Sequence, residues 1–107
     1  MTKQMQAALH IANYRSIKDF ALPAINVEQE EIHFDKMNYG VLSGGQKSAI
    51  SWLWCVWKDQ QVPETDDGDP EFTFNLAAGV RDPFAGFGNL DRELQTIILE
   101  AIAIRHS

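Results

Sequence analysis

The sequence has little that would tie it to an oxidising compartment or to a membrane. A single cysteine, Cys55, excludes an internal disulfide. No stretch approaches the ~20 apolar residues that a membrane-spanning helix needs, and the first residues lack the apolar core of a signal peptide. Because Cys55 lies in the apolar run of residues 52–57, we expect it to be a small buried hydrophobic residue. We therefore expect a soluble, cytoplasmic protein without membrane contact.

Basic residues are also scarce. Nine Lys and Arg stand against fifteen Asp and Glu, which gives a formal net charge of −6 and an isoelectric point near 4.8. This charge repels nucleic-acid phosphates and anionic lipids, so we expect no direct binding to nucleic acid. The length of 107 residues and the 45% content of apolar residues suit one globular domain that spans residues 1–107.

The first third of the chain predicts one long helix followed by extended structure. Apolar residues recur at spacings of three and four over residues 2–20, with Thr2 as the predicted N-cap. Pro23 ends this helix near residue 22, because proline lacks an amide hydrogen. Apolar and polar residues alternate in residues 25–34, which favours strands, although the central run of Glu and Gln also suits a helix.

Two further helices are predicted in the middle and at the end of the chain. Residues Gln46–Lys58 are apolar on nearly all sides, so this helix is either central to a core or covered by a partner. The last helix begins near Leu90, with Asn89 as its cap. Its main apolar stripe consists of Leu94, Ile97, Ile98, Ala101 and Ile104.

The segment between these two helices leaves the fold class partly open. Asp69-Pro70-Glu71 is typical of a helix start, yet residues 72–76 alternate as a strand would. The sequence therefore predicts a mainly α fold of three to four helices with one short hairpin built from residues 25–34 and 72–76. An α+β fold is the alternative.

Residues 42–46 carry a motif, Leu-Ser-Gly-Gly-Gln, that matches the signature sequence of ABC-type ATPases. Residues 13–20 resemble the first strand of the related chromosome-maintenance ATPases. The resemblance implies a nucleotide- or phosphate-responsive protein in which the Ser43–Gln46 turn sets a helix N-terminus against a phosphate. The sequence has no G-x-x-x-x-G-K-[S/T] phosphate loop. Ser43 followed by two glycines is also suited to cap the next helix, which is the interpretation that we favour.

Each candidate metal or catalytic residue lacks the partner residues that its chemistry would need. Glu31, His33 and Asp35 would share one face of a strand and could hold a divalent metal, but a solvated polar face is the favoured interpretation. Cys55 has only apolar neighbours, and Ser43 has no recognisable base. We therefore expect no catalytic residues, no metal and no cofactor.

The tryptophans give the strongest indication of a contact surface. On a helix Trp52, Trp54 and Trp57 point about 200° and 300° apart, so at least one is expected to reach the surface, where tryptophan is enriched in binding hot spots. Phe84 and Phe87 follow in a Gly-rich segment and complete the aromatic part of the predicted partner-binding surface.

An acidic segment supplies the second part of that surface. Residues 59–71 carry six acidic side chains and no basic one, and Asp66, Asp67 and Asp69 are the candidate contacts, although such a run is more typical of a solvated loop. The leading hypothesis is a small acidic, non-enzymatic protein-binding module, such as a bacterial or phage accessory or inhibitor protein, that acts on a larger host protein or nucleic-acid-handling complex. The nucleotide-responsive protein and a homodimer through the tryptophan helix are the alternatives.

Overall fold

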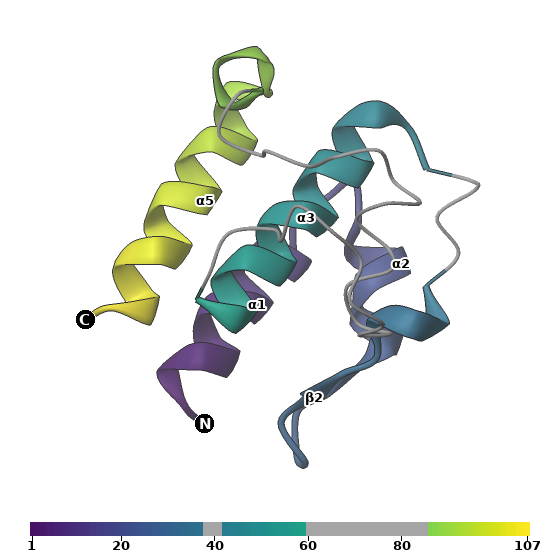
Figure 1. Cartoon of the computed structure of the whole chain (residues 1–107), viewed down its shortest axis with the longest axis vertical. Coiled ribbons are helices and arrows are strands. Elements are labelled where there is room, and N and C mark those ends of the chain that lie inside the picture. The colour runs from purple at the N-terminus through teal and green to yellow at the C-terminus, as the bar shows by residue number, and fades with distance from the viewer. Residues whose placement is uncertain (38–41, 60–85) are drawn as a thin grey trace, which may run out of the picture.

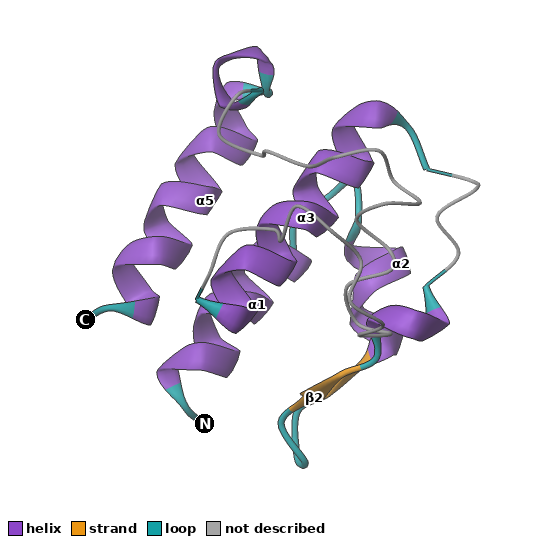
Figure 2. Cartoon of the chain, viewed as in Figure 1, coloured by secondary structure: helices purple, strands orange, loops and turns teal. Residues whose placement is uncertain are grey.

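The computed structural model describes residues 1–37, 42–59 and 86–107, and within these ranges the chain is mainly helical (Figure 2). The described helices are α1 (Lys3–Ala12), α2 (Lys18–Ala21), α3 (Gly44–Lys58) and α5 (Arg92–Arg105). Two strands, β1 (Ile25–Asn26) and β2 (Glu31–Ile32), and three 3-10 turns, η1 (Leu22–Ala24), η2 (Phe34–Lys36) and η4 (Phe87–Asn89), accompany them. The predicted mainly α class is confirmed. Among these helices none has the length and apolar character to span a membrane.

Helices α1, α3 and α5 pack against one another and form the core (Figure 1). α3 and α5 run in the same direction, and α1 runs opposite to both. The most extensive packing joins α1 to α5, followed by α1 to α3, while α3 and α5 touch less. α2 and the two strands lie on the other side of the molecule from α5. α1 is therefore the element that holds the other two long helices together.

Small side chains allow α1 to approach its neighbours closely. Ala7, Ala8 and Ala12 of α1 and Ala101 of α5 are buried, and the separation of packed helices depends on the size of the side chains at the contact. At the edge of the α1–α5 contact, Nε2 of His10 lies 3.2 Å from Oε1 of Glu100. The contact thus has small buried side chains at its centre and a polar pair beside them.

The single helix predicted for residues 2–20 is wrong, because the chain forms α1, a turn and α2 instead. The predicted N-cap is confirmed: the Thr2 hydroxyl accepts a hydrogen bond from the Met5 amide at 3.1 Å. Asn13 ends α1, and its side-chain amide donates to the Leu9 carbonyl at 2.8 Å, a local bond that competes with helix continuation. Within the following turn Tyr14 is buried. Residues 13–20 therefore hold no strand, in contrast to the ATPase resemblance.

The strands predicted in residues 25–34 are confirmed over a shorter length. Ile25 pairs with Ile32 and Asn26 with Glu31 in an antiparallel hairpin. The hairpin closes on itself, whereas the partner segment predicted for it, residues 72–76, lies outside the described residues. Phe34 belongs to η2 rather than to a strand, and its side chain is fully buried.

The start of the last helix also differs from the prediction. The cap of α5 is Asp91, whose carboxylate accepts from the Glu93 amide at 3.1 Å, and not Asn89, which lies in η4. An aspartate one residue before the helix outcompetes the asparagine because its charge also complements the positive end of the helix dipole. Of the predicted stripe, Leu94, Ile98 and Ala101 are buried.

Candidate functional site

The tryptophan helix is the centre of the core. Trp52, Trp54 and Trp57 are only 3%, 1% and 8% exposed, and every residue from Ala49 to Trp57 is buried. The prediction that at least one tryptophan reaches the surface is therefore wrong. α3 contacts both α1 and α5, so its apolar sides are covered. A role for these tryptophans in binding a partner stays a prediction, and in the folded chain they fill the core.

Phe87 is partly buried and packs against the same core cluster. Its ring meets that of Trp52 edge-on, with ring centroids 5.7 Å apart and planes inclined by 68°. Edge-to-face contacts of this kind stabilise aromatic pairs beyond the area that they bury. Phe84, Asp66, Asp67 and Asp69 lie outside the described residues, so their predicted contacts are untested.

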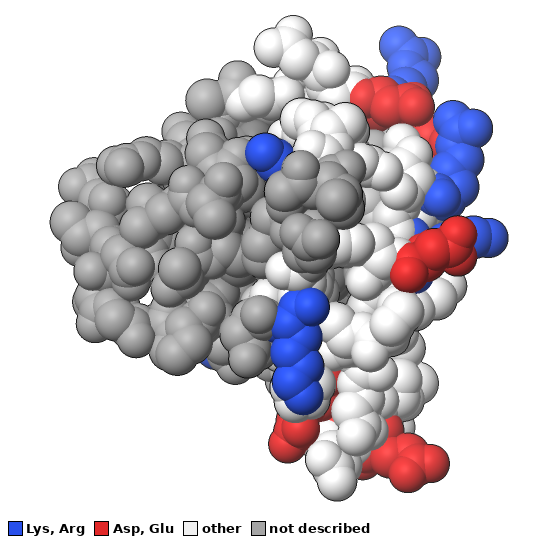
Figure 3. All heavy atoms as spheres, turned by 90° about the vertical axis from the view of Figure 1, so that its right-hand side faces the viewer, with Lys and Arg blue, Asp and Glu red and all other residues white. Residues whose placement is uncertain are grey.

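Charge is distributed unevenly along the chain. Outside residues 60–85 and 38–41 there are eight Lys and Arg against nine Asp and Glu, whereas residues 60–85 hold six acidic residues and one basic residue. Figure 3 shows acidic and basic side chains interspersed on one face of the described part, with acidic ones gathered at its lower end. The exposed residues Glu28 and Glu31 belong to the hairpin region. Most of the net charge of −6 is therefore carried by residues 60–85.

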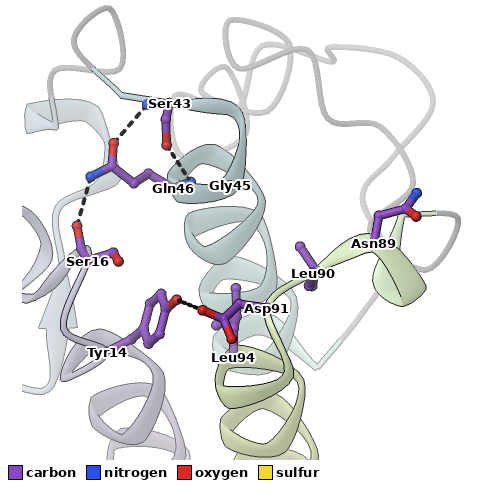
Figure 4. A pocket seen from close by; sticks show the side chains of 9 residues that line it. All are labelled: Tyr14, Ser16, Ser43, Gly45, Gln46, Asn89, Leu90, Asp91 and Leu94. Atoms are coloured by element: carbon purple, nitrogen blue, oxygen red, sulfur yellow. Dashed lines mark hydrogen bonds between the residues drawn. The ribbon is translucent and has the colours of Figure 1, made fainter.

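The Ser43–Gln46 turn caps α3, which confirms the favoured interpretation of the motif. The Ser43 hydroxyl accepts from the Gln46 amide at 3.2 Å, and the Gln46 side-chain oxygen accepts from the Ser43 amide at 2.8 Å. This reciprocal pair is a capping box. The side-chain amide of Gln46 also donates to the Ser16 carbonyl at 2.8 Å, so the motif fastens the turn after α1 to the start of α3 (Figure 4).

A pocket of about 150 Å³ lies beside this capping box, where α3 and α5 both begin. Tyr14 points across it, and its hydroxyl lies 3.5 Å from Oδ2 of Asp91 (Figure 4). The lining residues are Tyr14, Ser16, Ser43, Gly45, Gln46, Asn89, Leu90, Asp91 and Leu94. Its volume is below the roughly 300 Å³ at which ordinary ligand pockets begin, and it is small for a nucleotide.

The electrostatics of the pocket oppose an anionic ligand. The Asp91 carboxylate lies in its wall, while the nearby Arg15 guanidinium is 2.8 Å from Oε2 of Glu93 and 3.6 Å from Oδ2 of Asp91. Two carboxylates thus compensate one cation, and the described residues that line the pocket include no Lys or Arg. Helix N-termini attract phosphate through free amides and the helix dipole. Here Asp91 already occupies that position at α5, and the capping box occupies it at α3.

Among the described residues, three large apolar side chains are exposed, those of Met1, Val27 and Leu99, and the exposure of Leu99 in the middle of α5 was not predicted. Leu99 is 58% exposed, whereas its neighbour Ile98 is fully buried. One row of exposed side chains follows the helix at spacings of four and three residues, and it is called here the outer face of α5. It consists of Arg92, Thr96, Leu99, Ala103 and His106. The available signal was that Leu99 lies outside the predicted stripe, so the apolar side chains of residues 97–104 extend beyond the face that was expected to turn to the core.

The other candidate residues form no chemical site in the described ranges. Nε2 of His33 lies 3.4 Å from Oε2 of Glu31, but the strand ends at Ile32, so the predicted shared strand face with residue 35 is not formed. No group of three or more His, Cys, Asp and Glu side chains that could hold a metal occurs among the described residues. Cys55 is buried, as predicted.

Comparison with known proteins adds no relative. No protein-family model, no curated protein and no solved structure matches this chain. The five-residue signature motif is thus not accompanied by a match over a whole ATPase domain. Any proposal about function has to start from the geometry of the outer face of α5 and of the pocket.

Proposed function

We propose that this chain is a small non-enzymatic protein-binding module, and that the outer face of α5 is its contact surface. The observation that carries the proposal is the exposure of Leu99 at 58% in the middle of a long helix. Thr96 and Ala103 lie one turn to either side of it and are exposed too. Small neighbours around one large apolar side chain allow a partner to approach the helix backbone closely.

The charges beside this face also suit a protein partner. Glu100 lies 3.2 Å from His10, and Glu93 lies 2.8 Å from Arg15, so both acidic side chains on one flank are paired within the chain. Burial of Leu99 by a partner would contribute roughly 1.5–3 kcal/mol of hydrophobic free energy. Because both carboxylates keep their partners within the chain when this face is covered, the cost of their desolvation is small.

Site-specific photocrosslinking tests the proposal. A benzoylphenylalanine at Ala103, in cells that produce the protein, should give a covalent adduct with a protein, and the additional change Leu99→Glu should abolish it. The same photoreactive residue at Val27, which is 40% exposed on the hairpin, is the matched control and should give no such adduct. Absence of any protein adduct from Ala103 and from Thr96 would contradict the proposal.

The finer form of the proposal draws on the acidic residues 59–71. A bacterial or phage inhibitor that occupies a basic groove of a nucleic-acid-handling enzyme would bind less tightly as the salt concentration rises. Replacement of Asp66, Asp67 and Asp69 by Asn should weaken the adduct-forming complex at low salt. Unchanged affinity of this triple variant would remove the inhibitor form and leave the contact through α5 intact.

A further inference from the structure

The outer face of α5 has the spacing of a helix-pairing seam. Its residues follow one another at intervals of four, three, four and three, which is the pattern by which two helices pack along a shared line. Leu99 is the central member, and Arg92 and His106 stand seven residues to either side of it. A two-fold contact pairs a surface with an identical copy of itself, so residue 92 of one copy comes level with residue 106 of the other when the axis passes through Leu99.

We propose that the partner of this face is a second copy of the chain, packed antiparallel about Leu99. The inference rests on the proposed function, since it names the occupant of the same surface. In this arrangement Leu99 meets Leu99 of the second copy. Thr96 of one copy and Ala103 of the other differ by only about 1.5 Å in height along the helix axis. A leucine contact with small residues on both sides forms the apolar centre of the interface.

Charge complementarity at the two ends of the seam supports a second copy. Arg92 of one copy comes level with His106 of the other, and in each chain Oδ1 of Asp59 lies 3.0 Å from Nε2 of His106. Asp59 is the C-cap residue that follows α3, and its side chain is 47% exposed. Arg92 has no ion pair within the described residues, so it is available to meet the Asp59 carboxylate of the other copy. The two-fold axis makes this contact twice.

The size of the face sets the strength of the contact. A helix of 14 residues is about 21 Å long, and a pair of such helices buries less than the roughly 1,200 Å² of a standard stable interface. We expect a weak dimer with a Kd in the micromolar range or above.

Sedimentation equilibrium of the full chain between about 5 μM and 1 mM tests the dimer itself. The weight-average mass should rise from 12.1 kDa towards twice that value. Leu99→Glu should raise the Kd at least about tenfold, and Val27→Glu should leave it unchanged. A wild-type chain that stays monomeric throughout, or a Leu99→Glu variant that dimerises as well as the wild type, would overturn the inference. Such a failure would not touch the proposed function if the photocrosslink at Ala103 still captures another protein.

Cysteine substitutions test the antiparallel arrangement. Under mild oxidation Leu99→Cys should form a disulfide-linked dimer quickly, because the two copies of residue 99 face each other across the axis. Ala103→Cys should form it slowly, because eight residues along the seam separate that position from its copy by about 12 Å. The wild-type chain, in which Cys55 is buried, supplies the background rate. Equal rates for the two variants would overturn the antiparallel arrangement.

A charge exchange tests the end contacts. Arg92→Glu should raise the Kd about fivefold, and the combination of Arg92→Glu with Asp59→Arg should return it to within about twofold of the wild type. Circular dichroism of each variant checks that α3 still ends correctly, since Asp59 has a left-handed backbone with φ of 55°. A well-folded double variant that dimerises no better than Arg92→Glu alone would contradict the proposed pairing.

Discussion

Helices α3 and α5 both carry many apolar side chains, yet the two helices are buried to different extents. In α3 an unbroken run of nine residues, Ala49–Trp57, is buried. In α5 the buried residues are Leu94, Ile98 and Ala101, and Leu99 is exposed. The difference follows from position, because α3 lies between other elements whereas α5 lies at one edge of the molecule in Figure 1. The presence of apolar side chains on several sides of a helix thus does not show that each of them is covered by the same chain.

Truncation of the central tryptophan, Trp54, is expected to have the largest effect, and it tests whether α3 is the centre of the core. We expect Trp54→Ala to lower the free energy of unfolding by about 3–5 kcal/mol, because the side chain is 1% exposed and its loss leaves a large cavity. Urea unfolding followed by circular dichroism measures the change. A loss below about 1 kcal/mol would mean that α3 is not the centre of the core.

Two adjacent residues of α5, Ile98 and Leu99, allow a buried and an exposed side chain to be compared within one helix. Ile98→Ala should lower the free energy of unfolding by about 2–5 kcal/mol, since Ile98 is fully buried. Leu99→Ala should change it by less than about 0.5 kcal/mol, since Leu99 is mainly in solvent. Thermal unfolding at low protein concentration compares the two without a contribution from self-association. Equal losses would show that the outer face of α5 is covered within the chain.

The start of α3 gives an effect of intermediate size. Gln46→Ala removes half of the capping box and the bond to Ser16, and should cost about 1–2 kcal/mol. Gln46→Glu keeps an acceptor for the Ser43 amide but cannot donate to the Ser16 carbonyl. Chemical denaturation of both variants separates the two roles. If Gln46→Glu is as stable as the wild type, the bond to Ser16 contributes nothing measurable.

The smallest expected effect concerns nucleotide. A ligand that binds only the folded chain would raise the melting temperature by mass action. We expect millimolar ATP with magnesium to leave it unchanged, because Asp91 and the capping box occupy the two helix starts beside the pocket. A clear upward shift in differential scanning fluorimetry would revive the ATPase resemblance.

Much of the fold could be predicted from the sequence, because local chemistry decides it. Thr2 and Ser43 cap their helices as predicted, since short polar side chains satisfy free amides wherever a helix begins. The end of α1 at Asn13 was missed because the apolar periodicity continues through this residue. The turn that follows buries Tyr14, and that burial depends on contacts with distant elements, which periodicity does not show. The cap of α5 was misplaced by two residues for a related reason, since Asn89 and Asp91 are both good caps.

The sequence predicted that an apolar helix would need a cover, but it did not identify which residues are exposed. The sequence indicated that a helix apolar on all sides needs a cover, and it pointed to Trp52, Trp54 and Trp57 because of their size. Size does not determine exposure, however, and the three tryptophans occupy the interior. Leu99 lies outside the predicted apolar stripe, but its exposure depends on where α1 and α3 lie, which no local pattern encodes.

The packing of α1 against α5 has a consequence for how the chain reaches this structure. Contacts such as that between His10 and Glu100 join residues 90 positions apart, so the first helix meets its main neighbour only after the last helix has been made. Long-range contacts of this kind slow folding, because a large loop must close before they form. Until then the side of α1 that packs against α5 has no cover, and during synthesis the growing chain exposes an apolar surface that other unfinished chains can bind.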